Sequence, residues 1–133
     1  MRITIYTISE RIETFYIEAI KEYQKRLGRY CTINFFPLKR ANMLENKIKN
    51  NSYKILINNT GKTSPSEKLA LKLNQLGVTG TSDLSFIIGS DSTIYDETIT
   101  LSQMEMDIGL KTTILIEQLY RAFRIIHNHP YHK

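Results

Sequence analysis

The sequence lacks tryptophan and contains one cysteine and three prolines among its 133 residues. The single cysteine, Cys31, excludes an internal disulfide, and its neighbours in CTINFF indicate a buried, unreactive thiol. There is no run of about eighteen apolar residues, so no membrane-spanning helix is predicted. The opening MRITIYTISER lacks the apolar stretch and the small-residue cleavage site of a signal peptide. Together these absences predict a cytoplasmic protein.

Internal repeats, low-complexity tracts and Gly/Ser-rich linkers are also missing. The length suits a single domain, which we expect to cover residues 1–133. The formal net charge is +5, which permits a polyanionic partner because each phosphate contact releases a counterion. Many proteins without such partners are equally basic, so the charge alone identifies none.

Two periodicities organise the chain. Apolar alternation, or a high content of β-branched and aromatic residues, predicts strands at residues 2–8, 32–36, 53–57 and 84–88, with a possible strand at 99–106. Apolar residues at three- and four-residue steps predict helices at 10–27, 65–77 and 110–127. Residues 39–52 are expected to form a short helix or a mobile loop, and residues 90–98 a polar connection. Strands that alternate with helices predict an α/β fold with a parallel sheet covered by helices on both faces.

Helix ends and strand ends carry further expectations. Gly28 is expected to cap the first helix in a left-handed conformation, and Ser64 to cap the second helix in a capping box with Glu67. Ligands of parallel sheets bind beyond the carboxyl ends of the strands. In this chain those ends are residues 58–62, 89–92 and the stretch around Met106.

The last helix is apolar on several sides, which indicates burial on several sides. The residues concerned are Ile114, Leu115, Ile116, Leu119, Tyr120, Ala122, Phe123, Ile125 and Ile126. A small sheet covers one side, so a second subunit could cover another, and we expect a two-fold homodimer built on this helix. The alternative is a helix enclosed by the sheet and by other segments of the same chain.

Several motifs do not support a site. NNTGKTS resembles the end of a phosphate-binding P-loop, but that motif needs a glycine where this chain has Leu56. Gly61 is instead expected to be a turn glycine with positive φ. His127, His129 and His132 could in principle bind zinc or nickel, but the tract contains a proline and has no cysteine or carboxylate nearby, so we predict no metal site.

The C-terminal sequence EQLYRAFRIIHNHPYHK is the most informative segment. Arg121 and Arg124 are three residues apart, so they share a helix face and can grip phosphate. Tyr131 offers a ring for stacking, and His132 offers a group that titrates near neutral pH. By composition alone, an ordinary frayed terminus explains the segment equally well.

The stretch ILIEQLYRAFRIIHNHPYHK closely resembles the C-terminal signature of the RlmH family, whose members methylate N3 of a pseudouridine in large-subunit ribosomal RNA. MRITIYTI, EAIKEYQKRLGRY, LSFIIG and the strand leading to Gly61-Lys62 show weaker similarity, so the resemblance covers the whole chain, with shortened segments near residues 39–52 and 92–98.

The resemblance implies a SPOUT fold with a C-terminal trefoil knot, an obligate homodimer, and S-adenosylmethionine as cofactor. It also implies that ribosomal RNA in the ribosome is the partner. The cofactor would be held mainly by the backbone of Ile57, Gly89, Leu101, Ser102, Gln103, Met104, Glu105 and Met106. Arg121, Tyr131 and His132 would form an RNA-facing wall. His132 would be the group that removes the N3 proton or positions the target.

The chain departs from the family pattern near the expected cofactor site. Gly89-Ser90 replaces a Gly-Gly pair, and Ser92-Thr93 replaces a second turn glycine. Glu105-Met106-Asp107-Ile108 replaces Thr-Phe-Pro-His, and Thr112, with Lys111 beside it, occupies a basic position. The leading hypothesis is an active methyltransferase. The alternative is a divergent dimer that binds nucleic acid or a protein partner without methyl transfer.

Overall fold

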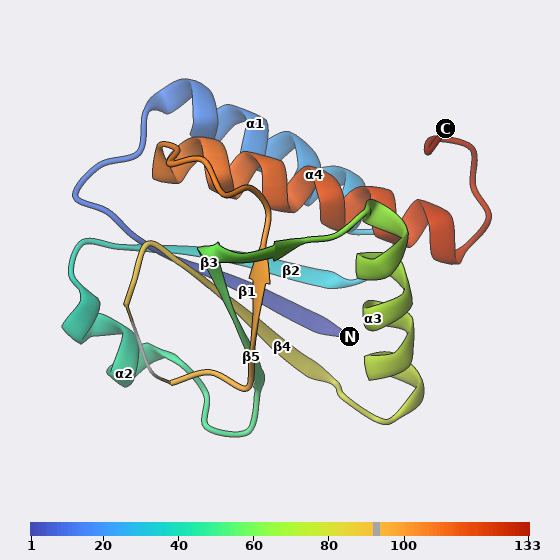
Figure 1. Cartoon of the computed structure of the whole chain (residues 1–133), viewed down its shortest axis with the longest axis horizontal. Helices are drawn as coiled ribbons and strands as arrows, with labels where there is room; N and C mark the ends of the chain where they lie inside the picture. Colours follow the sequence, from blue (N-terminus) through green and yellow to red (C-terminus); the bar gives the residue numbers. More distant parts are fainter. Residues whose placement is uncertain (92–93) are drawn as a thin grey trace.

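The computed structural model of the chain describes residues 1–91 and 94–133. Within them, five parallel strands form one sheet in the order β2-β1-β4-β3-β5 (Figure 1). The strands are β1 (Arg2–Ile8), β2 (Thr32–Leu38), β3 (Tyr53–Thr63), β4 (Asp83–Ile88) and β5 (Glu97–Thr100). The helices are α1 (Thr14–Leu27), the 3-10 helix η1 (Ala41–Met43), α2 (Leu44–Lys47), α3 (Ser66–Val78) and α4 (Ile108–Ile126). The α/β fold with a parallel sheet is thus confirmed, whereas the knot stays a prediction because strand order alone does not fix how a chain is threaded.

Two hydrophobic cores hold the helices to the sheet. Helices α1, α3 and α4 cover one face over the larger core, where Phe86 and Leu115 are fully buried. The short helices η1 and α2 lie on the other side, where Leu44 packs in a smaller core with Ile87. Strand β4 therefore contributes to both cores through successive residues. This explains why Phe86, Ile87 and Ile88 are apolar at successive positions rather than alternating with polar residues.

Helix α4 runs between α1 and α3 and is covered on several sides within one chain (Figure 1). All of its residues are buried or partly buried, and Ile114 and Ile125 are among the partly buried ones. The apolar surface of this helix therefore does not require a second subunit, and the homodimer must be argued on other grounds. None of the helices in the described part of the chain combines the length and the apolarity that crossing a bilayer requires.

Strands β3 and β5 differ from their predicted limits. Strand β3 continues to Thr63 with an irregularity after Asn58, and Gly61 lies inside it without a positive φ. The expectation of a turn glycine is therefore wrong. The Gly61 amide donates to Thr100 Oγ1 at 3.0 Å, and a Cβ on Gly61 would lie 2.7 Å from that oxygen, so glycine is needed for close approach. Of the possible strand at 99–106, only residues 99 and 100 belong to a strand, which is β5. Residues 101–107 form a coil.

Two predicted helix caps are also wrong. Gly28 ends α1 with φ −57°, a right-handed conformation. Helix α3 has Pro65 at its N-cap with no side-chain hydrogen bond there, so Ser64 and Glu67 form no capping box. The short helices η1 and α2 confirm the helical alternative for residues 39–52. Ser92 and Thr93, where the second turn glycine is missing, lie outside the described residues.

Candidate functional site

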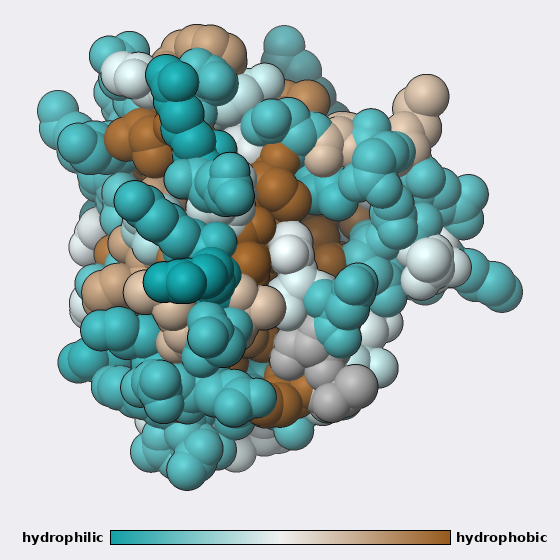
Figure 2. Space-filling model, turned by 90° about the vertical axis from the view of Figure 1, so that its left-hand side faces the viewer, coloured by the Kyte–Doolittle hydropathy of each residue, from teal (hydrophilic) through white to brown (hydrophobic). Residues whose placement is uncertain are grey.

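The three segments expected to hold the cofactor begin at adjacent positions on neighbouring strands. Ile57 on β3 pairs with Ile88 on β4 on one side and with Ile99 on β5 on the other. Gly89 follows Ile88 directly, and the coil that begins at Leu101 follows β5. The structure therefore brings these segments to the carboxyl edge of the sheet, where ligands of parallel sheets bind. Figure 2 shows this side of the molecule, with hydrophobic side chains at its centre among hydrophilic ones.

Gly89 turns the chain at this edge. Its φ of +86° disfavours any residue with a side chain. A Cβ built there would lie 2.6 Å from the carbonyl oxygen of Ile8 and 2.9 Å from Cδ1 of Ile108. Because backbone and the first turn of α4 both press on this position, Gly89 fixes how closely β1, β4 and α4 approach one another.

The coil from Leu101 to Met106 is anchored to β3 by side chains. Gln103 Nε2 donates to the Gly61 carbonyl at 3.0 Å. Asn59 Nδ2 donates to one carboxylate oxygen of Glu105 at 2.9 Å, and Lys111 Nζ lies 3.3 Å from the other. The hydrogen bond and the charge of Lys111 lower the pKa of Glu105. The Met104 side chain is 76% exposed, so the coil presents an apolar group to solvent.

The departures from the family pattern have structural roles here. Asp107 caps α4 by accepting a hydrogen bond from the Gly109 amide at 2.8 Å. Thr112 is fully buried and donates to the Ile108 carbonyl, so it offers no contact to a polyanion. The side chain of Lys111 is only 12% exposed and pairs with Glu105. This lysine therefore does not replace the missing basic residue as a free surface cation.

A cavity of about 520 Å³ adjoins Gly89. It is lined by Gly89, Ser90 and Asp91 after β4, by Ala41, Asn42, Leu44 and Glu45 of η1 and α2, and by Ile94. Its volume is in the range of small-molecule sites. The carboxylates of Asp91 and Glu45 favour a ligand that carries positive charge. Neither Ile57 nor the coil from 101 to 106 lines this cavity, so it contains only part of the expected cofactor set.

The C-terminal tail folds back along α4 rather than fraying. Asn128, with φ 55°, takes the left-handed position after the helix, and the His129 amide donates to the Arg124 carbonyl at 2.8 Å. Arg124 Nη2 donates to the Pro130 carbonyl at 2.8 Å, and Nη1 donates to the hydroxyl of Tyr30 at 3.1 Å. The same hydroxyl also forms a hydrogen bond with His129 Nδ1 at 2.6 Å. The frayed-terminus interpretation is therefore wrong.

Arg121, Tyr131 and His132 meet on this folded tail. Arg121 binds Glu117 Oε1 through Nε at 3.1 Å and Nη2 at 2.7 Å, and its guanidinium lies 4.8 Å from the centre of the Tyr131 ring. The Tyr131 hydroxyl donates to the same Glu117 oxygen at 3.2 Å. Burial raises the pKa of Tyr131, and the negative charge of Glu117 adds to the effect. The hydrogen bond to Glu117 raises the pKa of Arg121.

The hydrogen bonds of His132 determine which ring nitrogen carries its proton. Arg121 Nη1 lies 3.0 Å from Nδ1, and a guanidinium only donates, so Nδ1 is the acceptor. Nε2 therefore carries the proton and donates to Glu67 Oε1 at 2.9 Å. The one lone pair that could take a proton from a substrate is used by Arg121. Likewise, Arg121 and Arg124 both hold the tail, so the expected phosphate grip is not free in this arrangement.

The cofactor set and the tail set lie at opposite ends of α4 within one chain. Arg121 comes 13 residues after Ile108, which amounts to about 20 Å along the helix. Figure 1 shows the coil before α4 at one end and the C-terminus at the other. The structure therefore assembles each set but does not bring the two together.

Sequence reasoning missed Asn59 and Glu117, and it assigned Glu67 to a helix cap instead of to His132. Asn59 and Glu67 act through partners that only the fold brings near; Glu67 and His132 are 65 positions apart. Among residues 1–91 and 94–133, no group of three or more potential ligands is placed to hold a metal ion.

Comparison with known proteins gives a consistent result. The family model described as "Predicted SPOUT methyltransferase" matches residues 1–132. A protein of Thermoanaerobacter sp. (strain X514) named "Ribosomal RNA large subunit methyltransferase H 1" is 44% identical over 133 residues, all of both chains. "Ribosomal RNA large subunit methyltransferase H" of Clostridium beijerinckii is 35% identical over 159 positions that include all of both chains. That alignment requires gaps in this chain, as expected of shortened segments.

Proposed function

Because this chain belongs to the SPOUT methyltransferases of the RlmH family, we propose that it transfers a methyl group from S-adenosylmethionine to N3 of a pseudouridine in large-subunit ribosomal RNA. The observation that carries the proposal is the meeting of Ile57, Gly89 and the 101–106 coil at one edge of the sheet. A ribosomal substrate would place the reaction in the cytoplasm.

S-adenosylmethionine fits the residues at this edge. The backbone of Ile57, Gly89, Leu101, Ser102, Gln103, Met104, Glu105 and Met106 would hold it. The carboxylates of Asp91 and Glu45 beside Gly89 complement its cationic groups. When bound, this cofactor supplies a methyl group already activated by the positive sulfur. The protein therefore has chiefly to align the acceptor nitrogen with that methyl group.

The tail would supply the chemistry at the acceptor base. N3 must lose its proton as it attacks, so a base, or a charge that stabilises the anion, is needed. Arg121 would provide that charge once it leaves Glu117, and Tyr131 would provide a ring against which the target base can stack. His132 can accept the proton at Nδ1 only after Arg121 turns away from it. RNA binding to Arg121 would therefore prepare His132 as the base.

A homodimer would bring the two sets together. Within one chain they are about 20 Å apart along α4, which is too far for one group to serve the other. A two-fold axis across the α1–α4 side could place the tail of one subunit beside the 101–106 coil of its partner. The proposal therefore requires each site to be built from two chains.

Two measurements test this function. Calorimetric titration should show S-adenosylmethionine binding with one site per chain. Large ribosomal subunits that lack the modification should gain tritium from labelled cofactor, and mass spectrometry should locate the methyl group on one pseudouridine. Binding without methyl transfer to ribosomes, or methyl groups on another nucleotide, would contradict the proposed substrate.

The second candidate is a divergent dimer that binds nucleic acid or a protein partner without methyl transfer. It is favoured by the altered coil, because Asp107 and Thr112 are committed to capping and packing α4. This candidate predicts a stable dimer with no measurable affinity for S-adenosylmethionine. The same titration separates the two functions.

A further inference from the structure

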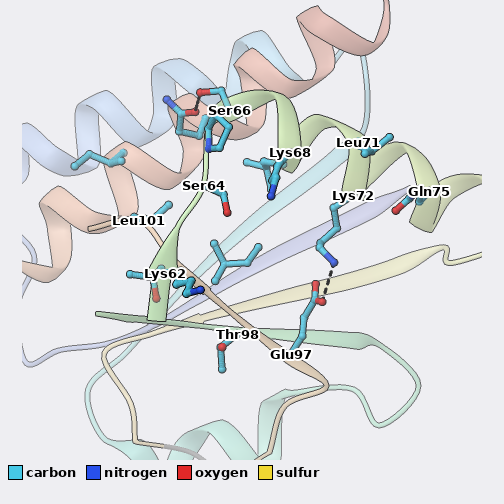
Figure 3. A pocket seen from close by; sticks show the side chains of 16 residues that line it. Lys62, Ser64, Ser66, Lys68, Leu71, Lys72, Gln75, Glu97, Thr98 and Leu101 are labelled. Atoms are coloured by element: carbon cyan, nitrogen blue, oxygen red, sulfur yellow. Dashed lines mark hydrogen bonds and ion pairs between the residues drawn. The ribbon is translucent and has the colours of Figure 1, made fainter. Parts of the chain in front are cut away.

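A second cavity, of about 620 Å³, lies between helix α3 and the edge strand β5 (Figure 3). The walls come from the end of β3, from α3, from β5 and from α4. They include Lys62, Lys68, Lys72, Leu69, Ile99 and Ile114. Leu101, the first residue of the coil beside the proposed cofactor site, also lines it. The cavity therefore adjoins the proposed cofactor site and shares Leu101 with it.

Three lysines line the cavity, and two of them give it a positive charge. Lys72 Nζ pairs with Glu97 at 2.9 Å, so its charge is balanced. Lys62, at the end of β3, and Lys68, on α3, are both exposed and have no ion pair within the described part of the chain. Figure 3 shows their side chains approaching the cavity from two different elements. Two uncompensated positive charges thus face one hollow.

The remaining lining suits a nucleotide rather than a bare anion. Leu69, Ile99 and Ile114 supply apolar surface against which a sugar or base can lie. Ser64, Ser66, Gln75 and Gln118 supply hydroxyl and amide groups. No glycine-rich segment surrounds the lysines, so the cavity lacks the backbone cradle that polyphosphates require. Two separate lysine charges without such a cradle are suited to the individually spaced phosphates of an extended nucleic-acid strand.

We propose that this cavity binds the sugar–phosphate backbone of a single-stranded RNA segment next to the methylated nucleotide, with Lys62 and Lys68 contacting phosphates. The inference rests on the proposed function, since it takes RNA as the substrate. Leu101 links the two places, because an RNA strand that leaves the target base at the coil passes directly into this hollow.

The experiment compares two double variants of the full chain. Lys62→Ala with Lys68→Ala removes both proposed contacts. Lys39→Ala with Lys47→Ala removes two exposed lysines near η1 and α2, on the other side of the sheet, and serves as a control with the same change in net charge. Fluorescence anisotropy measures binding of a labelled oligouridylate of about twelve nucleotides at several salt concentrations. Titration with S-adenosylmethionine and thermal unfolding are measured in parallel.

A phosphate contact to a single strand contributes about 0.7 to the slope of log K against log salt, which amounts to roughly fivefold in affinity at 0.1 M salt. Loss of Lys62 and Lys68 should therefore weaken RNA binding about 25-fold and lower the slope by about 1.4. The control should change affinity less than about threefold. Cofactor affinity and the unfolding temperature should not change in either variant.

Three results would overturn the inference. If the Lys62/Lys68 variant and the control have equal RNA affinity and equal salt dependence, these lysines do not contact RNA. The proposed methyl transfer would be unaffected by that result. Displacement of the oligouridylate by uridine monophosphate at equal concentration would make the cavity a mononucleotide site. Cofactor binding by the wild-type protein with no RNA binding would exclude this surface as an RNA site. Absence of both kinds of binding would contradict the proposed function itself.

Discussion

Replacing Gly89 with alanine should destabilise the protein and weaken cofactor binding. The alanine would have to keep the positive φ of Gly89, which costs about 1–2 kcal/mol for a residue with a side chain. It would also lie 2.6 Å from the Ile8 carbonyl oxygen and 2.9 Å from Ile108 Cδ1, and forcing an extra carbon into packed structure costs typically about 1–3 kcal/mol more. The expected loss of unfolding free energy is therefore about 2–5 kcal/mol.

The chain contains a matched control for the strain alone. Gly80, after α3, has φ +96°, but a Cβ there would meet nothing within 4 Å. Gly80→Ala should therefore cost only the backbone strain, about 1–2 kcal/mol, and should leave cofactor affinity unchanged. Urea unfolding followed by circular dichroism gives both free energies, and calorimetric titration gives the affinities. Equal losses of stability in the two variants, or an unchanged affinity in Gly89→Ala, would refute the role assigned to the close contacts of Gly89.

Three other predictions concern single side chains. Glu105→Gln removes the charge that pairs with Lys111, so the coil should loosen and calorimetry should show weaker cofactor binding; unchanged affinity would mean that this pair does not anchor the site. Cys31 is only partly buried, but this burial raises its pKa to about 11. At pH 8 iodoacetamide should therefore alkylate Cys31 about two orders of magnitude more slowly than a free cysteine. A reaction as fast as that of a free cysteine would contradict this. Desolvation and the charges of Arg29 and Arg124 lower the pKa of His129 below 6.5. The neutral imidazole therefore favours the folded tail above pH 6.5, and the tail should loosen as the pH falls through the lowered pKa of His129. An NMR titration of His129 with a midpoint at or above 6.5 would exclude this.

The sequence contained enough information for the architecture but not for every boundary. The buried run of β4 and the apolar periodicity of α4 reflect burial, which dominates folding, so these elements lie where they were predicted. The caps at Gly28 and Ser64 failed because the chain leaves α1 in a right-handed conformation and because α3 begins at Ser66, one residue later than a Ser64 cap requires. Gly61 was misread because its requirement comes from Thr100, 39 positions away, and not from a turn.

The candidate site was predictable only as a set of segments. Similarity to a known family pointed to the tail and to the strand ends. The partners that orient those residues, such as Glu67 for His132 and Asn59 for Glu105, are set by the fold and leave no local pattern. The homodimer was predicted from the apolar surface of α4, but α1 and α3 cover much of that surface. The separation of the cofactor residues from the tail residues along α4 is a better reason to propose a dimer.

Mixing two defective variants tests the two-chain site most directly. Gly89→Ala damages the cofactor end, and Arg121→Ala damages the tail. In a mixed dimer, one of the two sites combines an intact coil with an intact tail from the other subunit. Methyl transfer to large ribosomal subunits should therefore recover to about a quarter of the wild-type rate after random exchange of subunits. Mixed dimers detected by native mass spectrometry, with no more activity than either variant alone, would contradict the shared site.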